Sequence, residues 1–253
     1  MSTSSMPTAL VTNSTGYAGP PAVDALGEAG FRVLVHDRQF SDQAVLEEFL
    51  RLHPHAEYVR AESPAGLPGA AMNVTGRLDA IVSNDHYPAI QTASEKASLE
   101  DLRNTLEVLV VEPFAMLQAA IPYLKAQGRG NVIVITSCRT HSPIPGGAIP
   151  DMARAAANAM VRSLAVELAR HQIAVNAIAP NFLYSEAYYP RARFIDDPVG
   201  RAYVERTVPA RRLGRPDEIG EVIRFLATTQ AHFLTGAIID FNGAWPGCEV
   251  RPT

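Results

Sequence analysis

The chain has 253 residues, 47% of them hydrophobic, so it is long enough to bury one sizeable core, and we expect a single domain over 1–253. A formal net charge of -4 and a sequence pI near 6.0 provide no basic surface for nucleic acid or an anionic membrane. The start of the chain lacks the basic and apolar regions of a signal peptide, and no segment approaches about 18 uninterrupted apolar residues, so we expect a cytoplasmic protein.

Short apolar runs alternate with longer helical patterns along the chain. The runs that predict strands are 8–12, 32–36, 79–83, 131–136, 173–179 and 237–241. The helical patterns lie at 20–30, 41–53, within 99–127, at 151–171 and at 216–228. The segment 63–76 has no clear pattern. This alternation predicts an α/β fold, a doubly wound parallel sheet of the Rossmann type with crossover helices.

The least regular segment is 180–197, which is aromatic and interrupted by proline. It follows a predicted parallel strand, and open parallel sheets place their ligands beyond the carboxyl ends of the strands. We therefore expect the loop at about 180–199 to form a wall of the substrate pocket.

The segment TNSTGYAG at 12–19 follows the first predicted strand. From this strand almost to its end the chain resembles the short-chain dehydrogenase/reductase superfamily, whose loop reads T-G-x-x-x-G-x-G. Glycines there let the backbone approach the pyrophosphate of a dinucleotide. Two of the three glycine positions hold Asn13 and Tyr17, and only Gly19 remains, although Gly16 would allow a slip of one residue. We expect no dinucleotide cofactor.

Three further positions bear on the superfamily's usual redox chemistry. Asp37 ends the second predicted strand, where an acid holds a ribose hydroxyl in working dinucleotide sites, but we favour a capping or solvated role. Asn84 is expected to tie neighbouring backbone segments together. The catalytic asparagine of the superfamily corresponds to Leu109, which removes its usual proton relay.

The chain is similar to one branch of this superfamily in particular, the halohydrin dehalogenases. The resemblance rests on Tyr17, on His36, Asp37 and Phe40, on VSND at 82–85, on Pro113 and Phe114, and on ITS at 135–137, ARA at 153–155 and PNF at 180–182. It implies an enzyme without a nicotinamide cofactor or a metal, acting on a haloalcohol or an epoxide, and a homo-oligomer, dimeric or tetrameric.

The resemblance also implies which residues form the site. The branch's Ser-Tyr-Arg triad corresponds to Ser137, position 150 and Arg154, and arginine at 154 is typical of the branch. In that mechanism the arginine favours the tyrosinate, which removes the hydroxyl proton while the alkoxide displaces a neighbouring halide. The implied halide pocket consists of Tyr17, Pro180, Asn181, Phe182 and Leu183.

Position 150, however, holds proline, which has neither an ionisable group nor a donor. Proline suits the start of a helix, so Pro150 should spare the fold. Either another group supplies the base, or the activity is lost, or a variant reaction needs only Ser137 and Arg154. Candidate substitutes for the base are His141, Asp151, Tyr184, Tyr188 and Tyr189.

Three functions therefore remain open at this point. The favoured one is a halohydrin dehalogenase-like lyase. The second is an NAD(P)-dependent short-chain oxidoreductase, and the third is a catalytically impaired or non-catalytic paralogue.

Overall fold

Seven parallel strands form one central sheet in the computed structural model, which describes residues 6–247. Their order is β3-β2-β1-β4-β5-β6-β7. The strands are β1 (Thr8–Thr12), β2 (Arg32–His36), β3 (Ala56–Tyr58), β4 (Ala80–Ser83), β5 (Gly130–Ile135), β6 (Ile173–Pro180) and β7 (Ile238–Phe241). The predicted doubly wound α/β fold is confirmed.

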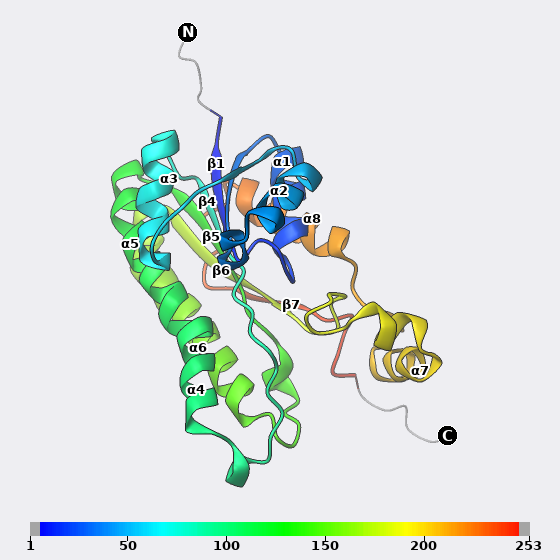
Figure 1. Ribbon diagram of the computed structural model, residues 1–253. Helices are drawn as coiled ribbons and strands as arrows, with labels where there is room; N and C mark the ends of the chain where they lie inside the picture. Colours follow the sequence, from blue (N-terminus) through cyan, green and yellow to red (C-terminus); the bar gives the residue numbers. More distant parts are fainter. Residues whose placement is uncertain (1–5, 248–253) are drawn as a thin grey trace.

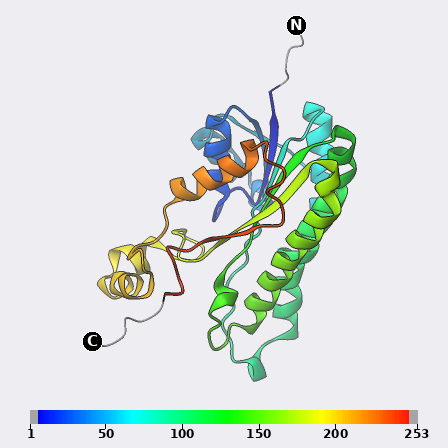
Figure 2. The ribbon, with the colours of Figure 1, turned by 180° about the vertical axis from the view of Figure 1, so that it is seen from behind.

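Helices cover both faces of this sheet (Figures 1 and 2). One layer contains α1 (Gly19–Glu28), α2 (Gln43–Leu52) and α8 (Pro216–Thr228); the other contains α3 (Leu67–Thr75), α4 (Leu99–Leu106), α5 (Glu112–Gln127) and α6 (Ala148–Leu168). Side chains alternate between the faces of a strand, so Val11 and Val35 pack in the first layer while Leu10 and Leu34 pack in the second. The near-continuous apolarity of the strands follows from burial on both faces.

The chain reverses its direction of winding next to β1, which pairs with β2 on one side and with β4 on the other. The carboxyl ends of these strands therefore border a crevice, the usual ligand position in open α/β sheets. The segment after β6 leaves the sheet and ends in a π-helical turn (Ala192–Asp196) and α7 (Pro198–Thr207). Figure 1 shows α7 standing apart from the two helical layers.

Apart from shifts of one or two residues at the ends of several elements, the structure differs from the sequence-based assignment in four places. Helix α6 begins at Ala148 rather than 151, because Gly147 is its N-cap. The segment without a clear pattern forms a 3-10 turn (Pro64–Gly66) and α3, and the three-residue strand β3 was too short to predict. The long pattern at 99–127 contains a π-helical stretch (Glu107–Val111) between α4 and α5.

The helical run Leu99–Gln127 is long and apolar enough to cross a membrane by length and composition alone. Its residues Met116, Leu117, Ala120 and Leu124 pack against the sheet in the core. This packing is ordinary for a core helix of a globular domain.

Candidate active site

A pocket of about 1120 Å³ lies beyond the carboxyl ends of β5 and β6. Residues from three separate segments meet there: Tyr17 from the loop after β1, Ser137 from the loop after β5, and Arg154 from α6. The segment after β6 and helix α7 form the outer wall. The sequence predicted that these residues share a pocket, and the structure brings them together.

Ser137 is held by two hydrogen bonds and is only 9% exposed. Its Oγ donates to the carbonyl oxygen of Pro180 at 3.1 Å and accepts from the backbone amide of Arg139 at 3.2 Å. The side chain of Asn158 donates to the Ser137 carbonyl oxygen at 3.3 Å. The hydroxyl is thus fixed between the ends of β5 and β6, where it lines the pocket.

Pro150 and Arg154 lie one turn apart on α6, and both line the pocket. Pro150 occupies the first turn, where backbone amides have no partner within a helix, so it leaves the helix intact. Arg154 is 5% exposed, and its Nη1 donates to the carbonyl oxygens of Asp85 at 3.0 Å and Ile135 at 3.2 Å. These bonds hold a permanent positive charge at the floor of the pocket.

Two of the candidate substitutes for the missing base, His141 and Asp151, do not line the pocket and are paired with other side chains. His141 Nδ1 lies 3.3 Å from Asp240 Oδ2, and His141 lines a separate pocket of about 350 Å³. Asp151 accepts a hydrogen bond from Arg139 Nε at 2.5 Å. Asp151 lies in the first turn of α6, whose N-cap is Gly147.

The three tyrosines after β6 have different partners. Tyr184 donates to Glu186 at 2.8 Å, and Tyr189 donates to Asn181 Oδ1 at 2.8 Å. Burial raises the pKa of Tyr189 above its ordinary value, which keeps this phenol protonated. Tyr188 instead meets Arg154, whose Nη2 donates to the Tyr188 phenol oxygen at 3.3 Å.

The loop predicted to receive halide lines the same pocket from Pro180 to Leu183. Phe182 adopts a left-handed backbone with φ 56°. The amide of Asn181 donates to Phe241, and the amide of Phe182 donates to Asn181 Oδ1 at 3.0 Å. Within residues 6–247 the amide of Leu183 and the Nδ2 group of Asn181 make no hydrogen bond, so these two donors are available to an anion.

Tyr17 also has a left-handed backbone, with φ 53°, although it carries a large ring. Its ring meets that of Tyr188 edge to face at a centroid distance of 4.9 Å, and burial raises its pKa above the ordinary value. On its other side lies His86, with ring centroids 6.2 Å apart. A Cβ on Gly16 would come within 2.8 Å of His86, so that ring is packed tightly against the loop.

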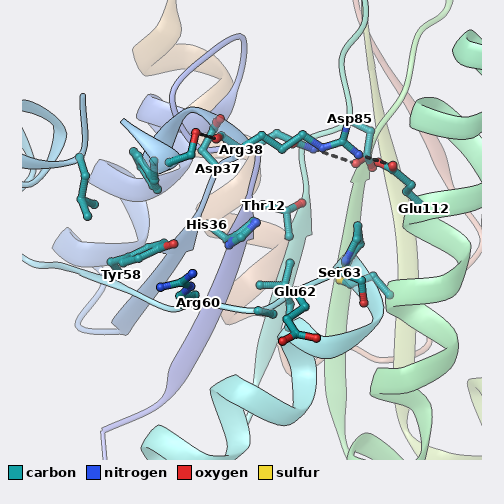
Figure 3. A pocket seen from close by; sticks show the side chains of 18 of the residues that line it. Thr12, His36, Asp37, Arg38, Tyr58, Arg60, Glu62, Ser63, Asp85 and Glu112 are labelled. Atoms are coloured by element: carbon teal, nitrogen blue, oxygen red, sulfur yellow. Dashed lines mark hydrogen bonds and ion pairs between the residues drawn. The ribbon is translucent and has the colours of Figure 1, made fainter. Parts of the chain in front are cut away.

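A second pocket, of about 820 Å³, lies beyond the carboxyl ends of β1 to β4. Figure 3 shows Arg38 extending across it to an ion pair with Glu112. Both carboxylate oxygens of Asp37 are engaged: Oδ2 accepts from the amide and hydroxyl of Thr15, and Oδ1 caps the following turn at Gln39. Asp37 therefore has the capping role that the sequence favoured.

Asp85 lines this second pocket and is 5% exposed. Its carboxylate accepts hydrogen bonds from Ser83 Oγ at 2.6 Å and Asn13 Nδ2 at 3.1 Å. Burial nevertheless raises the pKa of Asp85 to about 6, against the opposing effects of Ser83 and Arg154. An acid two residues after a buried strand was the available sequence signal, but only the tertiary structure shows its burial.

Two other predictions concerned Asn84 and Leu109. Asn84 donates to the carbonyl oxygens of Asn13 at 2.8 Å and Gly16 at 2.9 Å, so it ties the neighbouring backbone together as expected. Leu109 is 3% exposed and lines the active-site pocket from the π-helical stretch. It presents an apolar side chain to that pocket.

Sequence reasoning missed Tyr87 and Arg139 as pocket residues. Tyr87 holds the Tyr188 phenol through its own backbone, and Arg139 holds both Ser137 and Asp151. Neither belongs to a recognisable motif. Cys138, beside Ser137, is buried, and burial raises the pKa of its thiol to about 11, so it remains a protonated core residue.

Comparison with known proteins identifies one matching family model, relatives named as dehydrogenases or reductases, and solved structures named as dehalogenating enzymes. The family model described as enoyl-(acyl carrier protein) reductase matches residues 16–244. The human protein "Dehydrogenase/reductase SDR family member 4" is 30% identical over 244 residues, which cover 94% of this chain and 87% of the relative.

Two similar solved structures carry dehalogenase names. A halohydrin dehalogenase bound to ethyl (2S)-oxiran-2-ylacetate is 34% identical, with a TM-score of 0.93, and the match covers 97% of this chain and 100% of the other. A structure named "Dehalogenation enzyme" is 33% identical, with a TM-score of 0.90 and coverage of 95% and 98%.

Proposed function

We propose that this chain, which belongs to the short-chain dehydrogenase/reductase superfamily, interconverts vicinal haloalcohols and epoxides without a nicotinamide cofactor. The observation that carries the proposal is the shared pocket of Ser137, Arg154 and Tyr17, whose ring takes the place of a cofactor-binding glycine. The likeness to two dehalogenating enzymes at 33% and 34% identity supports it.

Separation of the two pockets supports the loss of a dinucleotide site. A dinucleotide spans the crevice at the switch point, yet the pockets of about 820 and 1120 Å³ share no lining residue. The segments Asn13 to Tyr17 and Asp85 to Tyr87 each run from one pocket to the other. Tyr17 lines the larger pocket, and its ring centroid lies 6.2 Å from that of His86.

The remaining groups suit the formation of an epoxide. Ser137 Oγ has a donor proton for the substrate oxygen in place of its present bond to Pro180. The charge of Arg154 stabilises negative charge that develops on oxygen as the hydroxyl proton leaves. The resulting alkoxide displaces halide from the neighbouring carbon.

The charge of the pocket suits a departing anion. Although the whole chain has a net charge of -4, the charged residues that line the pocket are four arginines and one aspartate: Arg139, Arg154, Arg193, Arg206 and Asp197. A pocket lined by one sign of charge raises the local concentration of the opposite ion. The free donors at Asn181 and Leu183 are available for direct contact with halide.

Halide release from a simple vicinal bromohydrin tests this function. The parent should release bromide and form the epoxide, and Ser137→Ala should lower kcat/KM by about 10²-fold or more. Ser142→Ala, on the same loop but outside the pocket, is the matched control and should behave as the parent.

The same samples should be assayed with alcohols and NAD or NADP. The alternative, a nicotinamide-dependent oxidoreductase, has the support of relatives named as dehydrogenases. A change in nicotinamide absorbance without halide release would establish it and reject the lyase. No turnover in either assay would identify a non-catalytic paralogue.

A further inference from the structure

We propose that Tyr188 is the catalytic base, reaching Arg154 from the segment after β6 and so replacing the phenol that Pro150 removes from α6. This inference rests on the proposed function and extends it. Tyr188 and Pro150 line the same pocket, although they belong to different elements.

Two donors, one of them cationic, are directed at the Tyr188 phenol oxygen. It accepts hydrogen bonds from Arg154 Nη2 at 3.3 Å and from the backbone amide of Tyr87 at 3.1 Å. Hydrogen bonds and positive charge directed at an oxygen stabilise its negative form. The phenol proton now points to the carbonyl oxygen of Tyr87 at 2.8 Å.

The position of Tyr188 is fixed by its own loop. Ser185 is buried, and its carbonyl oxygen accepts from the amides of Tyr188 at 3.3 Å and Tyr189 at 2.9 Å, which closes a tight turn. The edge-to-face contact with Tyr17 then holds the ring. The turn thus places the Tyr188 phenol in contact with the Arg154 guanidinium of α6, 34 residues away in the sequence.

The other phenols near the site lack these contacts. Tyr189 donates to Asn181 and Tyr184 donates to Glu186, so neither is directed at Arg154. Burial raises the pKa of Tyr17 and Tyr189, which opposes ionisation of both. Geometry therefore singles out Tyr188.

The reaction step balances without a co-reactant. The Tyr188 phenolate accepts the hydroxyl proton of the haloalcohol, and the electron pair of the broken O–H bond forms the new bond from oxygen to the neighbouring carbon. The carbon–halogen bond breaks, and its electron pair leaves with the halide. Epoxide and halide are released, and the protonated Tyr188 returns its proton to water.

Bromide release by the parent, Tyr188→Phe and Tyr184→Phe tests the assignment. Phenylalanine keeps the ring against Tyr17 and removes the oxygen with its three hydrogen bonds, so Tyr188→Phe should still fold, with a moderately lower melting temperature. Its kcat should fall by about 10²- to 10⁴-fold, the usual contribution of a general base, with KM within a few-fold of the parent. Tyr184→Phe, in the same loop but outside the pocket, should retain parental activity.

Pro150→Tyr in the Tyr188→Phe background adds a second measurement. The new tyrosine would lie one turn from Arg154 on the same helix face, so it should restore part of the lost kcat. Recovery would show that the missing group is a phenol near Arg154.

Three outcomes would overturn the assignment. Tyr188→Phe with undiminished or increased kcat would mean that Tyr188 only fills the pocket, and a loss confined to KM would make it a wall residue. An inactive parent made active by Pro150→Tyr would reject Tyr188 while keeping the pocket as a haloalcohol site. If the parent and every variant released no bromide, the proposed function itself would fail.

Discussion

At the scale of single residues, three non-glycine residues around the two pockets have a left-handed backbone. Asn13, Tyr17 and Phe182 have φ of 50°, 53° and 56°. A non-glycine residue in the left-handed backbone region destabilises the folded state by on the order of 1–2 kcal/mol, and such strain persists where the surrounding packing requires it. Two of these positions, Asn13 and Tyr17, correspond to glycines in the superfamily loop, and glycine is the residue that adopts this backbone without strain.

Asp85 makes the stability of the protein depend on pH. Its pKa rises from 3.8 to about 6 in the folded state, so the folded protein binds the proton more tightly than the unfolded chain. As pH rises from about 4 to about 6, the unfolded chain has already lost this proton, and the folded state loses stability. A shift of about two pKa units corresponds to about 3 kcal/mol.

Asp85→Asn should remove this dependence. The amide keeps the shape of the carboxyl group and does not ionise; its oxygen can accept from Asn13 Nδ2, and its Nδ2 group can donate to Ser83 Oγ. Urea unfolding of parent and variant between about pH 4 and pH 7 measures the effect, and the variant should gain up to about 3 kcal/mol relative to the parent across this range. A difference between the two proteins that stays constant with pH would contradict the prediction.

At the scale of elements, the candidate site is divided between a helix and an irregular segment. Helix α6 carries Arg154 rigidly, whereas the segment after β6 carries Asn181, Leu183 and Tyr188. That segment is supported by α7, which packs on the π-helical turn Ala192–Asp196. The position of α7 therefore controls the outer wall of the pocket.

Gly200→Ala tests this support. A Cβ at Gly200 would lie 1.7 Å from the carbonyl oxygen of Arg193, which is too close for any side chain. Helix α7 must move away, so we expect a loss of about 1–3 kcal/mol in the free energy of unfolding and a higher KM for the haloalcohol.

Gly69→Ala is the matched control, because its Cβ would meet only the Tyr123 hydroxyl at 3.4 Å. It should leave KM unchanged and preserve stability, since alanine favours a helix over glycine. Equal effects of the two substitutions would show that packing of α7 on the turn is unimportant.

At the scale of the whole molecule, the fold of a dinucleotide-binding superfamily is combined with a divided crevice. The pocket beside β1 to β4 and the pocket beside β5 and β6 share no lining residue, and Tyr17, whose ring centroid lies 6.2 Å from that of His86, lines the second of them. We propose that no dinucleotide spans these two pockets. The arginines that line the active-site pocket support the proposal that it takes a small anion instead.

Titration with NAD and NADP tests this arrangement directly. We expect no saturable signal up to about millimolar concentration, the range of the weakest useful affinity. Bromide titration of the same sample is the positive control: the change in intrinsic fluorescence should saturate, which would show that the protein is folded and binds an anion. A micromolar dissociation constant for either dinucleotide would reject the prediction.

Much of this protein can be recognised from sequence because local periodicity determines its elements. The apolar runs at β1 and β2 and the pattern at α8 coincide with the observed bounds. Ser137 follows the end of β5, and the loop from Pro180 follows the end of β6. Arg154 lies near the start of α6, which follows β5. Topology alone therefore brings them to the same edge of the sheet.

The sequence by itself also determined that Pro150 cannot act as a base, because this follows from covalent chemistry. It could not choose among Tyr184, Tyr188 and Tyr189, which share one short loop and the same chemistry. Only the tertiary structure decided that Tyr188 meets Arg154, that Asp151 pairs with Arg139, and that Asp85 is buried. Each of these depends on long-range packing, which selects one partner from several that local sequence leaves equivalent.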